Sequence, residues 1–193
     1  MNIRTSLFAS AALIAAVCSC GNGGSSNSTK NEIITEPLDS IEIKYAPVLA
    51  IGSAAPEISA PDSLGQIMSL SDFKGSYVVV DFWATWCPDC RNELPDLKAV
   101  YDEYKDKKVN GKKVEFLSVS FDRDEQAWKK MVREEGLVWN QIADIGKKWK
   151  ESPITNAYSL GWIPTFYLIG PDGKIVASGI KAFRMGEALK GLE

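Results

Sequence analysis

The residues of this chain that can do chemistry are two cysteines in the motif WCPDC at residues 86–90, which directly follows the apolar run YVVVDFW at residues 77–83. Two thiols at this spacing can close a reversible disulfide. The pattern predicts a strand that turns into a helix at Cys87, and the unpaired N–H groups and dipole of a helix start favour a thiolate there. The thiolate is the species that attacks disulfides. We therefore predict thiol–disulfide exchange, with Cys87 attacking and Cys90 resolving; the alternative is a structural disulfide.

A carboxylate, Asp81, stands inside the otherwise apolar run before the cysteines. Burial of an unpaired carboxylate is costly, so a buried Asp81 has to be protonated or hydrogen-bonded. In that position it can accept the proton of Cys90, directly or through water. The alternative is an aspartate at the end of a strand that faces solvent.

Composition limits the function further. The chain has 193 residues, a formal net charge of −3, 45% hydrophobic residues and 24% charged residues, as expected for one globular domain with a leader. It has no basic block, so we expect no nucleic-acid partner. The absence of histidine excludes Cys-His and Ser-His catalytic pairs and histidine-ligated metals. Two of the four cysteines lie in the leader, and the other two are too few for a zinc or iron–sulfur site, so we expect neither metal nor cofactor.

Residues 1–19 have the pattern of a secretory signal peptide, in which Arg4 precedes an apolar stretch at residues 7–17 that is too short to span a bilayer. The segment VCSC at residues 17–20 resembles a bacterial lipobox, which predicts lipid attachment at Cys20. Residues 20–50 begin with a stretch rich in Gly, Ser and Asn and are predicted to be a flexible tether. We expect an exported protein that is lipid-anchored to a membrane of the cell envelope or periplasm; the alternative is cleavage and secretion without an anchor.

Strand and helix patterns alternate through residues 51–193, which we predict to form the domain. Residues 55–59 and 66–70 flank a turn with Pro, Asp and Gly and predict a β-hairpin. The further elements expected are a strand at 76–83, a helix from the cysteines onward with a kink at Pro95, a strand at 114–121, a helix capped by Asp122 or Asp124 and ended by Gly136, short helices near 145–150 and 153–158, strands at 165–169 and 174–178, and a final helix through 185–192. This order predicts an α/β fold with a central mixed sheet flanked by helices.

Several of these motifs together resemble the thioredoxin superfamily, and in particular its exported TlpA/ResA-like branch. The resemblance is carried by VDFWATWCPDC at residues 80–90, RNELP at 91–95, GWIPT at 161–165 and the hairpin segment at 52–75. It implies a thioredoxin-like fold with an N-terminal β-hairpin extension. It also favours the proton-acceptor role for Asp81.

The resemblance further implies a substrate-binding edge beside the cysteines. Pro164 would be a cis-proline that faces the dithiol, and the Ile163 backbone would pair with a substrate segment. Trp86 would cover the sulfurs and contact the substrate. The alternatives are a trans proline at a strand start and simple core packing of Trp86. The family implies disulfide-containing exported proteins as substrates, apocytochrome c among them, and a membrane thiol-electron transporter as reductant.

We expect an enzyme of the thiol-disulfide oxidoreductase type that works as a reductase of protein disulfides. Three alternatives stay open, namely a disulfide-donating oxidase, a peroxiredoxin-like peroxidase and a redox-inert binding module on the same fold. A peroxidase would want Thr or Ser where this chain has Ala84. Asp89 departs from the residue pairs common between the two cysteines of the family, and its charge opposes a thiolate at Cys87.

Overall fold

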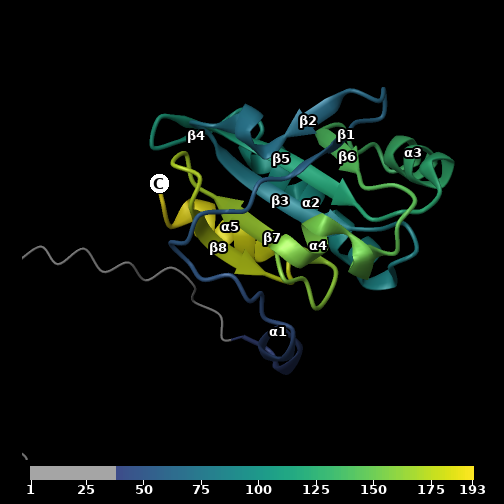
Figure 1. Ribbon diagram of the computed structural model, residues 1–193. Coiled ribbons are helices and arrows are strands. Elements are labelled where there is room, and N and C mark those ends of the chain that lie inside the picture. Colours follow the sequence, from purple (N-terminus) through teal and green to yellow (C-terminus); the bar gives the residue numbers. More distant parts are fainter. Residues whose placement is uncertain (1–37) are drawn as a thin grey trace, which may run out of the picture. The chain divides into compact units, whose positions relative to one another are not determined.

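A run of seven buried residues forms β3 (Tyr77–Trp83), the central strand of the computed structural model, which describes residues 38–193 (Figure 1). A continuous apolar run suits a strand that is covered on both faces. β3 pairs in parallel with β5 (Lys112–Ser120) and antiparallel with β7 (Thr165–Ile169). In the described part of the chain the mixed sheet has six strands in the order β4-β5-β3-β7-β8, with β6 also paired to β5. The bounds of the other three strands are β4 Lys108–Val109, β6 Asn140–Ala143 and β8 Ile175–Gly179.

Three helices pack on one side of this sheet. The longest, α2 (Pro88–Tyr104), directly follows β3 and contacts α5 (Phe183–Lys190). Lys98 of α2 forms a 2.8 Å salt bridge with Glu135 at the end of α3 (Glu125–Glu134). The start of α2, where the cysteines lie, is therefore held in place by packing along the rest of the helix.

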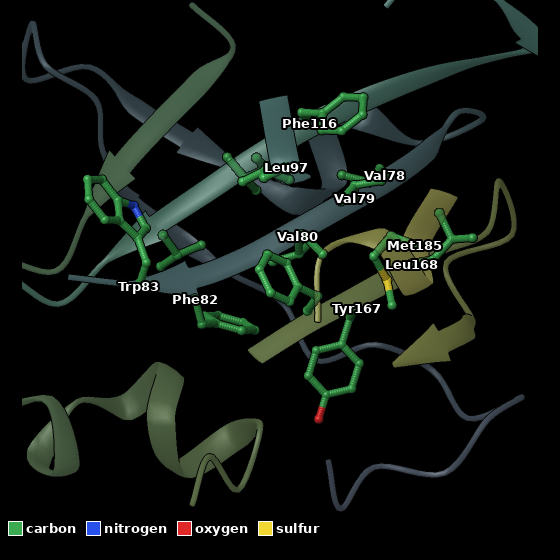
Figure 2. Close-up of a cluster of buried hydrophobic side chains, with 14 of the residues drawn as sticks. Val78, Val79, Val80, Phe82, Trp83, Leu97, Phe116, Tyr167, Leu168 and Met185 are labelled. Atoms are coloured by element: carbon green, nitrogen blue, oxygen red, sulfur yellow. The ribbon is translucent and has the colours of Figure 1, made fainter. Parts of the chain in front are cut away.

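The core is divided by β3 into two parts. Figure 2 shows Leu97 of α2 on one side of the strand and Phe82 on the other. Phe82 packs against Tyr158, at the end of α4 (Pro153–Ala157), with ring centroids 4.8 Å apart. Because side chains alternate along a strand, Asp81 faces the opposite side from Phe82, which is the side covered by α2.

The N-terminal hairpin consists of β1 (Ser59–Pro61) and β2 (Ile67–Ser69), which pair antiparallel. The Asp62 carboxylate closes the turn by accepting bonds from the backbone N–H groups of Leu64 and Gln66, at 2.8 and 2.9 Å. Two single helical turns complete the described chain, η1 at Leu70–Phe73 and η2 at Trp149–Glu151. The hairpin, the flanking helices and the mixed sheet confirm the predicted α/β architecture.

Two elements differ from the sequence-based expectations. The strand β6 lies in a stretch for which only short helices were expected, because its first two residues are polar and its pairing with β5 is not visible in the sequence. The helix α1 (Ser40–Lys44) lies within the tether predicted at residues 20–50. The chain around α1 is part of the folded unit rather than a linker, because Glu42 forms a buried ion pair with Arg184 of α5.

The predicted signal peptide at residues 1–19 and the predicted lipidation site Cys20 lie outside the described residues. Within residues 38–193, no helix has both the length and the apolar composition needed to cross a bilayer.

Candidate active site

Cys87 and Cys90 form a disulfide at the N-terminus of α2, with Cα atoms 5.3 Å apart. Cys87 is the N-cap residue, and its Sγ accepts a 3.1 Å hydrogen bond from the backbone N–H of Cys90. In the reduced protein this N–H and the helix dipole stabilise negative charge on Cys87. The two cysteines are 5% and 3% exposed, so the redox pair lies in a largely covered site.

The loop before β7 places Ile163 against the disulfide. The Ile163 carbonyl oxygen lies 3.5 Å from Cys87 Sγ, although the two residues are 76 positions apart in the chain. The Ile163–Pro164 peptide bond is cis, in agreement with the expectation for Pro164. The Thr165 hydroxyl donates a 2.8 Å bond to the Trp162 carbonyl and so fixes the loop at the start of β7.

Asp81 is 3% exposed on the α2 side of β3. Ser118, its direct neighbour in the parallel register, donates a 3.1 Å hydrogen bond to Asp81 Oδ2. The indole N–H of Trp139 donates to Ser118 Oγ at 2.8 Å, which leaves the serine proton to point at Asp81. Burial raises the pKa of Asp81 to about 7, the Ser118 hydrogen bond opposes this increase, and the nearby negative charge of Glu93 adds to it. Asp81 Oδ1 has no hydrogen-bond partner among the described residues, so it is available to a proton.

Glu93 lies in α2 close to the redox pair and is 7% exposed. Its Oε1 accepts a 3.0 Å bond from Lys181 Nζ, and its Oε2 accepts a 3.0 Å bond from the backbone N–H of Ala182, the N-cap residue of α5. The structure gives Glu93 a buried position in which it joins α2 to α5 and acts on the pKa of Asp81.

Asp122 holds the turn that carries the cysteines, and it is 2% exposed. It accepts bonds from the Thr85 N–H at 3.0 Å, the Thr85 hydroxyl at 2.6 Å and the Ser120 hydroxyl at 2.7 Å. Thr85 stands two residues before Cys87, so these bonds fix the entry to the motif. Sequence reasoning considered Asp122 only as a helix cap, whereas Asp124 caps α3.

Trp86 is 50% exposed and lines a cavity of about 540 Å³ beside the redox motif. Phe121 and Trp149 supply further apolar walls, and Arg123 and Lys148 stand at the cavity with cationic groups. The exposure of Trp86 argues against simple core packing. An apolar cavity of this size next to the cysteines suits a segment of bound polypeptide.

Comparison with known proteins assigns the family. The model described as "AhpC/TSA family" matches residues 51–178, which is more than half of the chain. The chain belongs to this family. It is 35% identical over 128 residues to thiol-disulfide oxidoreductase ResA of Bacillus thuringiensis, covering 66% of this chain and 68% of that protein. It is 32% identical over 127 residues to ResA of Geobacillus kaustophilus, with 66% and 67% covered.

Solved structures lead to the same assignment. The chain superposes on the thioredoxin domain of a thiol-disulfide oxidoreductase from Bacteroides vulgatus with a TM-score of 0.66 and 37% identity. The superposition covers 76% of this chain and 100% of that domain. A thiol-disulfide oxidoreductase from Bacteroides fragilis gives a TM-score of 0.65 at 30% identity, with 73% and 100% covered. These neighbours confirm the thioredoxin-like fold and the predicted superfamily.

The AhpC/TSA protein is therefore a thioredoxin-fold thiol-disulfide oxidoreductase, as predicted. The Cys87–Cys90 disulfide argues against a redox-inert binding module. The structure brings Cys87, Cys90, Ile163 and Pro164 together at the start of α2, with Trp86 beside them and Asp81 in the sheet under α2. Sequence reasoning missed the supporting residues, which are Glu42, Asp122, Ser118 and Trp139. A polar residue inside or just after a buried strand was the signal for Ser118 and Asp122; Glu42 had none, because its partner is distant in the chain.

Proposed function

We propose that this protein reduces disulfide bonds of exported proteins, with Cys87 as the attacking sulfur and Cys90 as the resolving one. The observation that carries the proposal is the position of Cys87 Sγ, which accepts the Cys90 N–H at the start of α2 and lies beside the Ile163 carbonyl. A thiolate is stabilised at such a position, and an extended substrate segment can pair with backbone groups along Ile163. We propose Pro164 and Trp86 as further substrate contacts.

The reaction is a two-electron exchange. The Cys87 thiolate attacks one sulfur of the substrate disulfide, and a mixed disulfide forms as the substrate S–S bond breaks. The other substrate sulfur leaves as a thiolate and takes a proton from solvent. Cys90 then gives its proton to Asp81, and the Cys90 thiolate attacks Cys87 Sγ. The second substrate thiolate leaves and is protonated from solvent. The substrate has gained two electrons, and the protein ends with the Cys87–Cys90 disulfide.

Asp81 suits the role of proton acceptor in this scheme. Burial brings the pKa of Asp81 to about 7, which is near the value an efficient general base needs at neutral pH. The Trp139–Ser118 pair occupies Oδ2 and leaves Oδ1 for the proton.

We propose the reductase direction because of Asp89. This exposed carboxylate lies in the first turn of α2, where it opposes negative charge on Cys87 and so favours the disulfide form over the thiolate. A dithiol of this kind gives up its electrons more readily. An exported compartment keeps a bare dithiol oxidised, so a membrane thiol-electron transporter is the proposed reductant. The proposed acceptors are misoxidised exported proteins and apocytochrome c, and the proposed location is the cell envelope, with a lipid on Cys20.

Trapping and a potential measurement test the proposal. Purified Cys90→Ser protein, mixed with a disulfide-bonded protein such as insulin and separately with envelope extract, is expected to accumulate mixed disulfides that dithiothreitol releases. The control, with both cysteines replaced by Ser, is expected to trap nothing. The reduced wild type is expected to accelerate insulin reduction.

An equilibrium reduction potential near that of DsbA, about −120 mV, would instead assign the oxidase direction. Rapid consumption of hydrogen peroxide would assign the peroxidase activity.

A further inference from the structure

The short helix α1 is fixed to the domain by a buried ion pair. The Glu42 carboxylate accepts two bonds from the Arg184 guanidinium, from Nε to Oε1 at 2.9 Å and from Nη2 to Oε2 at 3.1 Å. The two residues are 6% and 4% exposed. Asp39 caps the helix by accepting the N–H groups of Ile41 and Glu42 at 2.8 and 2.7 Å. A bidentate, covered pair of this kind is geometrically specific, so α1 has a defined place on the domain.

That place is beside the redox pair. Ile41 and Tyr45 line a cavity of about 380 Å³ that also has Asp89 and Pro164 in its wall. Tyr45 stacks on Trp162 with ring centroids 4.0 Å apart and an interplanar angle of 21°. Part of the cavity wall is therefore formed by Asp89, which is next to Cys90, and by Pro164, which is next to Ile163. Another part is formed by α1.

We propose that α1 forms one wall of a pocket for a large apolar side chain of the substrate, next to the cysteine that bonds to Cys87. The inference rests on the proposed function and adds the determinant of substrate preference. The rings of Tyr45 and Trp162 and the side chain of Ile41 would make the contact.

The occupant follows from the chemistry of the site. During the reaction the substrate is covalently attached at Cys87 Sγ, which lies 3.5 Å from the Ile163 carbonyl. The next residue, Pro164, is already part of the cavity wall. The residues on one side of the substrate cysteine can therefore reach this cavity, and those on the other side can reach the cavity at Trp86. Ile180, itself buried, adds a further apolar surface to the lining of the cavity at α1.

The cationic groups at this cavity are already engaged with other groups of this protein. Lys181 is paired with Glu93 at 3.0 Å, and Lys44 lies over the Tyr45 ring at 4.9 Å from its centroid. Asp89 and Asn92 also line the cavity, and its apolar surface is supplied by Ile41, Tyr45, Trp162, Pro164 and Ile180. Aromatic and aliphatic walls bind large apolar side chains, and the volume lies within the usual range of ligand pockets.

The test compares two disulfide-linked peptides that differ only in Phe or Gly beside the reactive cysteine. Wild-type protein is expected to show a kcat/KM about tenfold higher for the Phe peptide, as for burial of part of an aromatic side chain. Tyr45→Ala and Ile41→Ser are each expected to bring this ratio toward one, through KM. The matched control is Ile43→Ser, because Ile43 is exposed on the same helix and is not part of the cavity wall. It is expected to keep the wild-type ratio.

A second measurement does not depend on these variants. In the trapped mixed disulfide of Cys90→Ser with the Phe peptide, backbone amides of residues 41–45 are expected to gain protection from hydrogen exchange over the same complex with the Gly peptide. The pocket proposal would be contradicted by equal kcat/KM values for both peptides in the wild type, or by an unchanged Phe/Gly ratio in Tyr45→Ala. Equal hydrogen-exchange protection of residues 41–45 in the two complexes would also contradict it. Failure of the wild type to reduce either peptide would instead overturn the proposed function.

Discussion

At the scale of single residues, we propose that two aspartates act on the redox pair in different ways. Asp81 is buried, so its proposed effect depends on its protonation state. Asp89 is exposed in the first turn of α2, so its proposed effect is that of its negative charge on the Cys87 thiolate. Each leads to a prediction with its own measurement.

Asp81→Asn is expected to raise the stability of the folded protein and to slow the resolving step. The pKa of Asp81 rises from 3.8 in the unfolded chain to about 7 on folding. Its contribution to stability is therefore fully present below about pH 4 and is lost as the pH rises to about 7. The gain of the variant should grow across this window and then level off, at no more than about 4 kcal/mol. Denaturant unfolding of both proteins at pH 4, 6 and 8 measures it, and a variant that is less stable than wild type at pH 8 would contradict the buried-acid argument.

Asp89→Asn is expected to make the reduction potential more positive, by about 10–30 mV, because loss of the negative charge stabilises the Cys87 thiolate. Equilibration with glutathione buffers measures the potential. Asp96→Asn is the matched control, since Asp96 is an exposed aspartate of the same helix about 10 Å further along its axis. An equal shift in both variants would show that general charge, rather than the position of Asp89, sets the potential.

At the scale of elements, α2 is stabilised mainly by features within its own sequence, whereas α1 is stabilised by a residue far away in the chain. α2 has 17 residues, a cap at Cys87 and a face of buried side chains, so its signal is local and the sequence predicts it. α1 has five residues, too few to be stable alone, and it depends on a bond between Glu42 and Arg184, which are 142 positions apart. Asp39 and Glu42 form a local capping box at the start of α1, but no pattern within residues 20–50 indicates the pairing with Arg184. The strand β6 was missed for the same reason, since pairing with β5 defines it.

Acid is expected to release α1 before the domain unfolds. The hydrogen bond from Arg184 lowers the pKa of Glu42 below 4.5, so the stability that this pair contributes is present above about pH 4.5 and is lost as the pH falls through the lowered value. Release separates Tyr45 from Trp162, which tryptophan fluorescence can follow while far-UV circular dichroism reports the rest of the fold. Glu42→Gln is expected to show the released signal already at neutral pH. A wild-type fluorescence that is constant down to the acid unfolding transition would contradict this prediction.

At the scale of the whole molecule, the fold and the redox centre were predictable, whereas the network that supports them was not. The buried run of β3, the cysteine spacing and the apolar run of β7 are short-range signals, and each lies where it was expected. Ser118 and Asp122 meet the site because β5 lies parallel to β3, and Trp139 meets it because it precedes β6, the strand paired with β5. Their sequence positions alone do not relate them to the cysteines.

The predicted anchor belongs to this scale as well, and it lies outside the described residues. Cys20→Ala is expected to remove fatty-acid labelling and to shift the protein from the membrane fraction to the soluble envelope fraction, because two buried acyl chains give stable anchoring. Cys18→Ala is the control, and it is expected to keep both the label and the membrane location. Labelling that survives in Cys20→Ala would contradict the assignment of the lipid to this residue.

Cys87 is only 5% exposed. A rigid partner protein whose disulfide lies level with its own surface therefore cannot bring that disulfide into line with Cys87 Sγ. Exchange requires three sulfurs nearly in line, so access governs its rate. A polypeptide that is still flexible around its disulfide can insert the disulfide far enough to reach Cys87. Under the proposed function, tightly packed secreted proteins are therefore expected to keep their disulfides, and incompletely folded ones are expected to be reduced.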